Sequence, residues 1–303
     1  MPPDDTHRLI HDLRARLDDA GLRGSLLARD LRTGEQIGLD PDIERPSASL
    51  VKIPLAVAVL DQIRRGQLDG ARPVDVQPGA IATPGPMGLS RFRHPARIAV
   101  DDLLYLSTAV SDNTAADALF DLVPPAAVAH FLSEAGITGI TVRHRLHLLA
   151  ETPVERFEQD QVQLAHSLAI GAGTSSRGHP IRQLDVSRSN TGSASAFVGL
   201  LHELWVPVRL HPGPAAKVRA LMRHNVVRHR LAPDFSADDI TWSSKTGTLL
   251  NLRHEIGVAE HADGQVIAVA VMTESSVPAA AQPAAEALLA GVARRLHDHL
   301  RVP

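Results

Sequence analysis

The spacing of apolar residues changes along this chain, and that change constrains the fold more than any other sequence feature. Near the two ends, short apolar runs bounded by turn residues predict a hairpin at 24–39 and strands at 240–247, 255–260 and 265–273. Asp263-Gly264 is a hairpin turn signal between the last two strands. The stretch between the ends has helical spacing instead. Strands supplied by both ends predict one antiparallel sheet with a helical segment inserted into it.

Helical periodicity accounts for most of the remaining chain. The predicted helices cover residues 7–22, 49–60, 99–110, 114–120, 125–135, 191–204, 215–222 and 284–300. Residues 70–95 and 171–190 are rich in Gly, Pro, Ser or Arg and are predicted loops. Thr191 and Ser193 are alternative N-caps for the helix that follows them.

These elements predict an α+β fold. Its antiparallel sheet has about five strands, counted from the predicted runs, and is flanked by the terminal helices. We expect residues 1–48 and 226–303 to form a discontinuous α/β lobe and residues 49–225 to form an all-α lobe. A cleft between two such lobes is the natural place for a ligand.

Composition excludes several classes of function. The formal net charge of −3 and the absence of a basic run interleaved with aromatic residues argue against nucleic acid as a partner. The chain has no cysteine, which excludes disulfides, thiolate metal sites and cysteine nucleophiles. No apolar run reaches membrane-spanning length and no secretory signal is visible at the N-terminus, so a cytoplasmic protein without a membrane partner is expected. The oligomeric state stays open.

Ser49 is the first candidate for chemistry. It follows a turn rich in Pro and Ser and begins a helix, and Lys52 lies one turn later on the same face. A lysine there can take the serine proton, and amide groups at a helix N-terminus can stabilise an oxyanion. The alternative is a capping serine beside a surface lysine, because a lone Ser-x-x-Lys tetrad is common by chance.

Two further polar clusters strengthen the functional interpretation of Ser49-x-x-Lys52. Ser111-Asp112-Asn113 and Lys245-Thr246-Gly247 follow Ser49-x-x-Lys52 in the order found in class A β-lactamases and penicillin-binding proteins. The chain resembles that serine hydrolase family over most of its length, apart from about 143–190. The flanking residues that carry the resemblance are Pro46–Leu60, Thr114–Asp117, Pro125–Val128, Phe131-Leu132, Thr248-Leu249, Arg253 and Ile256-Gly257.

The resemblance implies a role for each of these positions. Ser49 would attack an acyl carbonyl, Lys52 would take its proton, and Ser111 would pass a proton to the leaving nitrogen. A second ammonium, from Lys245, together with desolvation would depress the pKa of Lys52. The N–H groups of Ser49 and Thr248 would form the oxyanion hole. The residues implied in substrate binding are Asn113, Lys245, Thr246, Gly247, Thr248 and Arg253, with a solvent-exposed strand residue as the alternative for Arg253.

The chain departs from the family at the step that removes the acyl group. Class A enzymes use a Glu in an E-x-x-L-N segment to activate water, and no such segment occurs between the second and third motifs. The possible deacylation bases near that place are His147, Glu151, Glu155 and Glu158, each with a surface charge as the alternative. We therefore expect acylation to be intact and release to be slow.

Sixteen histidines raise the question of a metal site. His144 with His147, or His224 with His229, could pair, but neither pair has an obvious third ligand and no H-E-x-x-H occurs. No metal and no cofactor are expected.

Three functions remain open. The first is a β-lactamase-like serine hydrolase that forms an acyl-enzyme on Ser49 with a β-lactam or related amide. The second is a cytoplasmic serine acyltransferase, amidase or esterase of a metabolite. The third is a non-enzymatic binding or sensor protein that is acylated and stays so. All three need only a small-molecule partner.

Overall fold

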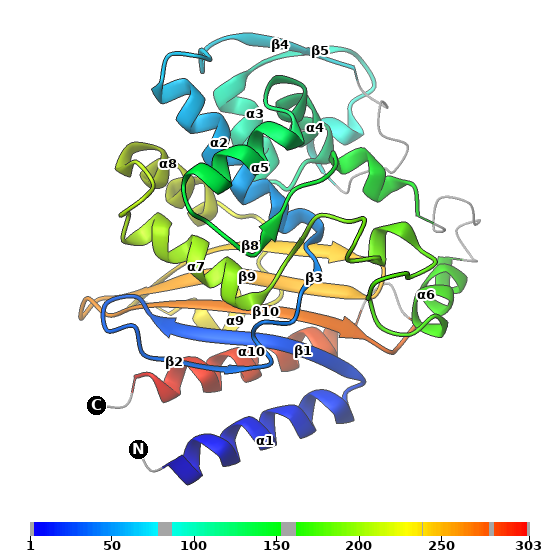
Figure 1. The fold of residues 1–303 in the computed structure, drawn as a ribbon, viewed down its shortest axis with the longest axis vertical. Coiled ribbons are helices and arrows are strands. Elements are labelled where there is room, and N and C mark those ends of the chain that lie inside the picture. Colours follow the sequence, from blue (N-terminus) through cyan, green and yellow to red (C-terminus); the bar gives the residue numbers. More distant parts are fainter. Residues whose placement is uncertain (1–2, 78–86, 153–161, 238, 279–281, 302–303) are drawn as a thin grey trace.

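A five-stranded antiparallel sheet forms the centre of the molecule (Figure 1). The structure is a computed structural model that describes residues 3–77, 87–152, 162–237, 239–278 and 282–301. The strand order is β2-β1-β10-β9-β8, so the two ends of the chain meet where β1 pairs with β10. This confirms the predicted fold class. The strands are β1 (Leu22–Asp30), β2 (Gln36–Leu39), β8 (Ile240–Leu249), β9 (Leu252–His261) and β10 (Val266–Ser275).

Strand β10 shows why the sheet is covered on both faces. From Val266 to Met272 its residues are apolar without alternation, and successive side chains of a strand point to opposite faces. Ala268, Ala270 and Met272 therefore enter the large core on one side. Their neighbours Ile267, Val269 and Val271 enter the smaller core on the other side.

The terminal helices cover one face of the sheet. Helices α1 (Pro3–Asp19) and α10 (Pro283–His299) both contact β1, and their apolar residues share one core with that face (Figure 1). Helix α7 (Ala194–Trp205) contacts β1, β9 and β10 from the opposite face. The division into lobes at residues 48 and 225 stays a prediction.

The remaining elements lie mostly beyond α7, around the long apolar helix α2 (Lys52–Arg64) (Figure 1). The helices are α3 (Val100–Thr108), α4 (Asn113–Leu122), α5 (Pro125–Glu134), α6 (Val162–Gly171), α8 (Pro212–Arg223) and α9 (Ala232–Phe235). The short strands are β3 (Arg45–Pro46), β4 (Pro73–Val76), β5 (Ala96–Ala99), β6 (Ile140–Thr141) and β7 (Thr191–Gly192). Strands β3, β7 and β6 form one small sheet and β4 and β5 another.

Several predicted boundaries were wrong for local reasons. Gly21 has φ +68°, which ends α1 early, and Leu22 joins β1 instead of the helix. Thr191 lies in β7, and it is Ser193 that caps α7 by accepting the N–H of Ala196. Strand β8 does not stop at Gly247, because its ladder with β9 continues to Leu249.

Helix α6 was not predicted at all. Its exposed side includes the apolar Leu164 and Leu168, each about half exposed, and its buried side includes His166, so polar and apolar residues do not separate onto two faces. Its inward residues Ala165 and Ala169 pack against Ala48, Leu249 and Leu250. The described residues contain no single helix that is long and apolar enough to cross a membrane, although α4 and α5, bent by 73°, pass that test as a pair.

Candidate active site

The predicted motif residues meet at a cavity of about 700 Å³. Ser49, Ser111, Asn113, Thr246, Thr248 and Arg253 all line it. They come from the start of α2, the α3–α4 junction, β8 and β9, which are far apart in sequence. The other lining residues are Met87, Val226, Val227, His229, Arg230, Gln282, Pro283 and Glu286.

Ser49 lies in a 3₁₀ turn, Ala48–Val51, that runs directly into α2. The residue before it, Ala48, has φ +47°, a left-handed conformation that costs a non-glycine residue energy and persists only where its surroundings enforce it. Here the N–H of Ser47 donates to Asn190 O at 2.8 Å, and the Pro46 carbonyl lies 3.0 Å from His254 Nε2. The strap that leads into Ser49, residues 46–48, is therefore held by hydrogen bonds to Asn190 on one side and to His254 on the other.

Lys52 is fully buried beneath Ser49, which excludes the surface-lysine alternative. Its Nζ donates to Ser111 O and Asn113 Oδ1, both at 2.6 Å, and lies 3.4 Å from Ser111 Oγ. Burial lowers the pKa of Lys52 to about 7, because desolvation disfavours the ammonium ion more than nearby carboxylates favour it. Of the two predicted causes, loss of solvent is the main one, and repulsion from Lys245 is not among the causes of the shift.

Ser111 adopts a strained backbone with φ +63°. The next residue, Asp112, is buried and caps α4 by accepting the N–H groups of Thr114 and Ala115 at 2.8 and 3.2 Å. Asp112 also accepts from Ser90 Oγ at 3.0 Å and from Leu89 N. This carboxylate therefore fixes the turn that presents Ser111 and Asn113 to the cavity.

Lys245 reaches the same serine from the edge strand β8. Its Nζ donates to Ser111 Oγ at 2.8 Å and to Thr246 O at 2.7 Å. Burial, and then the charge of Lys52, lower the pKa of Lys245 well below its ordinary value. Gly247 allows β8 to lie against the turn that holds Ser49, because a Cβ there would be 3.0 Å from Ser47 O and 3.1 Å from Leu50 Cγ.

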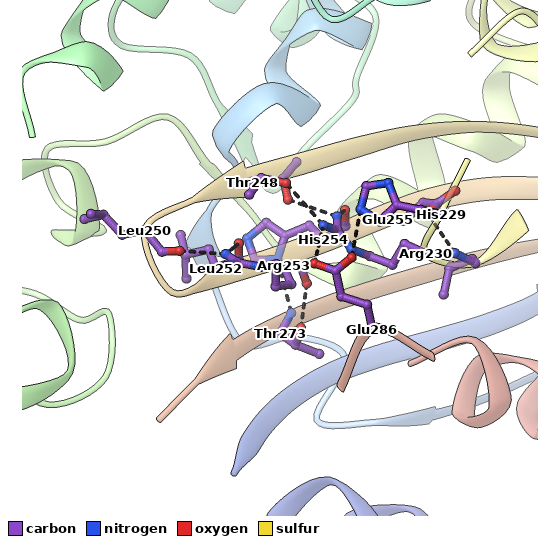
Figure 2. Close-up of polar contacts among 12 residues, drawn as sticks. His229, Arg230, Thr248, Leu250, Leu252, Arg253, His254, Glu255, Thr273 and Glu286 are labelled. Carbon is purple, nitrogen blue, oxygen red and sulfur yellow. Dashed lines mark hydrogen bonds and ion pairs between the residues drawn. The ribbon is translucent and has the colours of Figure 1, made fainter. Parts of the chain in front are cut away.

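Arg253 is buried rather than solvent-exposed, which removes the alternative for this residue. Its Nε lies 3.3 Å from Glu286 Oε1, and Arg230 Nη2 lies 3.3 Å from the same oxygen (Figure 2). Arg230 Nη2 also donates to Thr248 Oγ1 at 3.2 Å. Sequence reasoning missed Arg230 and Glu286, because neither belongs to a recognised motif. The packing of α10 on the sheet brings Glu286 to the cavity, and the segment between α8 and α9 brings Arg230.

The structure brings neither described candidate for the deacylation base to the cavity. His147 lies in a 3₁₀ turn with its Nδ1 3.4 Å from Asp117 Oδ2, and Glu151 is exposed. Neither residue lines the cavity. Glu155 and Glu158 lie outside the described residues.

His144 and His229, one from each pair that could have held a metal, have other partners. His144 Nδ1 lies 2.8 Å from Arg145 O, and its Nε2 accepts the N–H of Asn190 at 3.1 Å. His229 Nε2 lies 2.8 Å from Glu286 Oε2. Within the described part of the chain, no group of three or more His, Asp or Glu side chains is arranged to hold a metal ion.

Comparison with known proteins agrees with this geometry. The model of the β-lactamase enzyme family matches residues 8–300. The chain belongs to that family. A curated relative, the β-lactamase regulatory protein BlaB of Streptomyces cacaoi, is 62% identical over 304 residues, which cover 97% of each chain.

Solved structures of the β-lactamase fold superpose on nearly the whole chain. A β-lactamase from Chitinophaga pinensis has a TM-score of 0.77 at 19% identity and covers 98% of this chain and 99% of its own. The L158E mutant of PBP-A, solved as an acyl-enzyme complex with penicillin G, has a TM-score of 0.75 at 18% identity, with 99% of each chain covered. At these identities the likeness supports the fold alone.

Proposed function

We propose that this member of the β-lactamase family forms an acyl-enzyme on Ser49 with a β-lactam or a related amide. The observation that carries the proposal is Ser111 Oγ, which lies 2.8 Å from Lys245 Nζ and 3.4 Å from Lys52 Nζ on the wall of the cavity that Ser49 also lines. A hydroxyl between two buried amines is suited to carry a proton between them.

Acylation would proceed in two proton-coupled steps. The neutral form of Lys52 takes the Ser49 proton as Ser49 Oγ bonds to the carbonyl carbon, and a pKa of about 7 leaves much of that form present at neutral pH. The C–N bond then breaks, Ser111 gives its proton to the leaving nitrogen, and Lys52 returns a proton to Ser111. The N–H groups of Ser49 and Thr248 would stabilise the oxyanion, each contributing about a hundredfold in rate.

The cationic wall of the cavity would bind an acidic group on the ligand. Lys245, Thr246 and Arg253 were expected to do so from the sequence, and Arg230 adds a second buried guanidinium beside Thr248. Arginine suits carboxylate recognition because its planar fork can donate two parallel hydrogen bonds.

Release of the acyl group would be slow. No E-x-x-L-N segment occurs, and among the described residues the carboxylate that lines the cavity is Glu286, whose two oxygens are already in contact with Arg230, Arg253 and His229. The name of the 62% identical relative, a β-lactamase regulatory protein, favours a second function for a long-lived acyl-enzyme. In that function the protein acts as a β-lactam-responsive regulator rather than as a β-lactamase with rapid turnover.

Intact-mass spectrometry tests the proposal. Incubation with benzylpenicillin should add the mass of one penicillin to the wild type, and the adduct should outlast removal of free drug. Ser49→Ala should stay unmodified, and Glu151→Gln should acylate and release as the wild type does. No adduct with several β-lactams would contradict the proposal. Fast hydrolysis of nitrocefin would show that the protein is a β-lactamase with rapid turnover and would contradict the regulator function.

A further inference from the structure

One wall of the cavity holds two buried arginines around a single carboxylate. Arg230 is 1% exposed and Arg253 is 2% exposed. Glu286 Oε1 lies 3.3 Å from Nη2 of the first and 3.3 Å from Nε of the second. Its other oxygen, Oε2, lies 2.8 Å from His229 Nε2, and Figure 2 shows Glu286 pointing toward all three residues.

The backbone holds the two arginines in place independently of Glu286. Arg230 Nη1 donates to His254 O at 2.6 Å. Arg253 Nη1 donates to Leu250 O at 2.6 Å and to Leu252 O at 2.8 Å. Within the described residues, the buried Nε of Arg230 has no hydrogen-bond partner. Loss of the carboxylate would therefore free guanidinium donors without releasing the side chains that carry them.

Glu286 belongs to the first turn of α10, where the helix dipole favours a negative charge. Its carboxylate offsets part of the repulsion between the two guanidinium groups. Burial, and then the charge of Arg230, lower the pKa of Arg253. A ligand carboxylate that approached the same donors would meet Glu286 as a like charge. Glu286 therefore competes with a ligand carboxylate for the donors of Arg230 and Arg253.

We propose that Glu286 is a specificity-determining residue that lowers the preference of the cavity for acyl donors carrying a carboxylate over uncharged ones. This inference rests on the proposed acylation of Ser49. It deepens that function by defining the substrate class: the cavity accepts acyl donors that are uncharged at this subsite nearly as well as anionic ones. A repulsive element of this kind is a general means of adjusting specificity.

The experiment compares benzylpenicillin with its methyl ester, a pair that differs only at the carboxylate. Acylation rates of both are measured by intact-mass time courses for the wild type, Glu286→Gln and Glu260→Gln. Glutamine keeps the shape of residue 286 and removes its charge. Glu260 is the matched control, because it is a glutamate on the sheet that pairs with Arg223 and does not line the cavity.

The rate ratio of free acid to ester should rise about tenfold or more in Glu286→Gln, the size expected for a charge-assisted contact, and should stay within about twofold of wild type in Glu260→Gln. In the wild type itself, the ratio should be below about tenfold. Because the wild-type ratio needs no variant, the inference stays testable even if Glu286→Gln fails to fold.

Two results would overturn this inference and leave the proposed acylation of Ser49 intact. One is a wild-type preference for the free acid of about a hundredfold or more. The other is a Glu286→Gln variant in which both rates change equally, or in which the free-acid rate falls. Either result would mean that Glu286 holds the two arginines in position and does not set the preference between acid and ester. Absence of any adduct on the wild type would instead overturn the proposed function, and this inference with it.

Discussion

Lys245 Nζ donates to Ser111 Oγ at 2.8 Å across 134 positions of sequence. The same hydroxyl lies 3.4 Å from Lys52 Nζ, so a side chain at the α3–α4 junction links an edge strand to the nucleophile helix. Both amines are fully buried and both have a lowered pKa. The serine thus lies between two amines whose neutral forms are favoured by burial.

Removal of the Ser111 hydroxyl should slow acylation. Ser111→Ala deletes the group that would protonate the leaving nitrogen, and we expect the acylation rate with benzylpenicillin to fall about a hundredfold or more. Ser107→Ala is the matched control, because Ser107 Oγ in α3 is buried without a hydrogen-bond partner in the described residues. Its acylation rate should be unchanged. Equal rates for Ser111→Ala and wild type would show that Ser111 carries no proton.

Acylation should increase with pH through the pKa of Lys52. In the proposed mechanism the base is the neutral amine, so the rate should rise about tenfold per unit of pH below about 7 and level off above it. Intact-mass time courses, quenched at set times at each pH from about 5 to 9, measure the profile. Lys52→Arg, which stays protonated, should be slow at every pH. A flat wild-type profile would mean that another group takes the Ser49 proton.

Gly247 should tolerate no side chain. In Gly247→Ala the new Cβ would lie 3.0 Å from Ser47 O, pushing β8 away from the nucleophile turn, and we expect a loss of about 1–3 kcal/mol in the free energy of unfolding together with slower acylation. Gly199→Ala in α7 is the control, because its Cβ would meet nothing within 4 Å and alanine should stabilise a helix by about 1 kcal/mol. Urea unfolding distinguishes the two; a Gly247→Ala variant as stable as wild type would refute the close approach.

His254 should stabilise the strap that precedes Ser49. The ring accepts the Thr273 N–H and lies 3.0 Å from the Pro46 carbonyl, so His254→Leu leaves two buried backbone groups unpaired and should cost about 2 kcal/mol or more. The exposed His130→Gln is the control, with no expected change in the free energy of unfolding. A His254→Leu variant that unfolds at the wild-type urea concentration would contradict this role.

The same residue should contribute to acid denaturation. Burial lowers the pKa of His254 in the folded protein to about 3, whereas the ordinary value is 6.5. The unfolded chain therefore binds more protons between these values, and the stabilisation that is complete above pH 6.5 is lost as the pH falls toward 3. Urea unfolding at pH 7 and pH 5 should show a smaller acid loss for His254→Leu than for wild type. The variant should still lose some stability in acid, because His297 also has a lowered pKa, of about 4, and remains in place.

The sequence alone determined the fold class, because strand and helix periods are local properties. The short apolar runs bounded by turn residues near both ends and the apolar spacing through α2 were enough to predict an antiparallel sheet with helices between its strands. The three short motifs supplied Ser49, Lys52, Ser111 and Lys245, since the order of such motifs is itself information.

Only the tertiary structure decided how those residues act. The lowered pKa of Lys52 depends on burial, and no spacing rule reveals how much solvent a side chain loses. Glu286 reaches the cavity because α10 packs on a sheet whose strands come from both ends of the chain, and Arg230 reaches it because its guanidinium bonds to His254 O of β9. Contacts between residues so distant in sequence leave no local pattern, so the charge of this wall could be read only from the folded molecule.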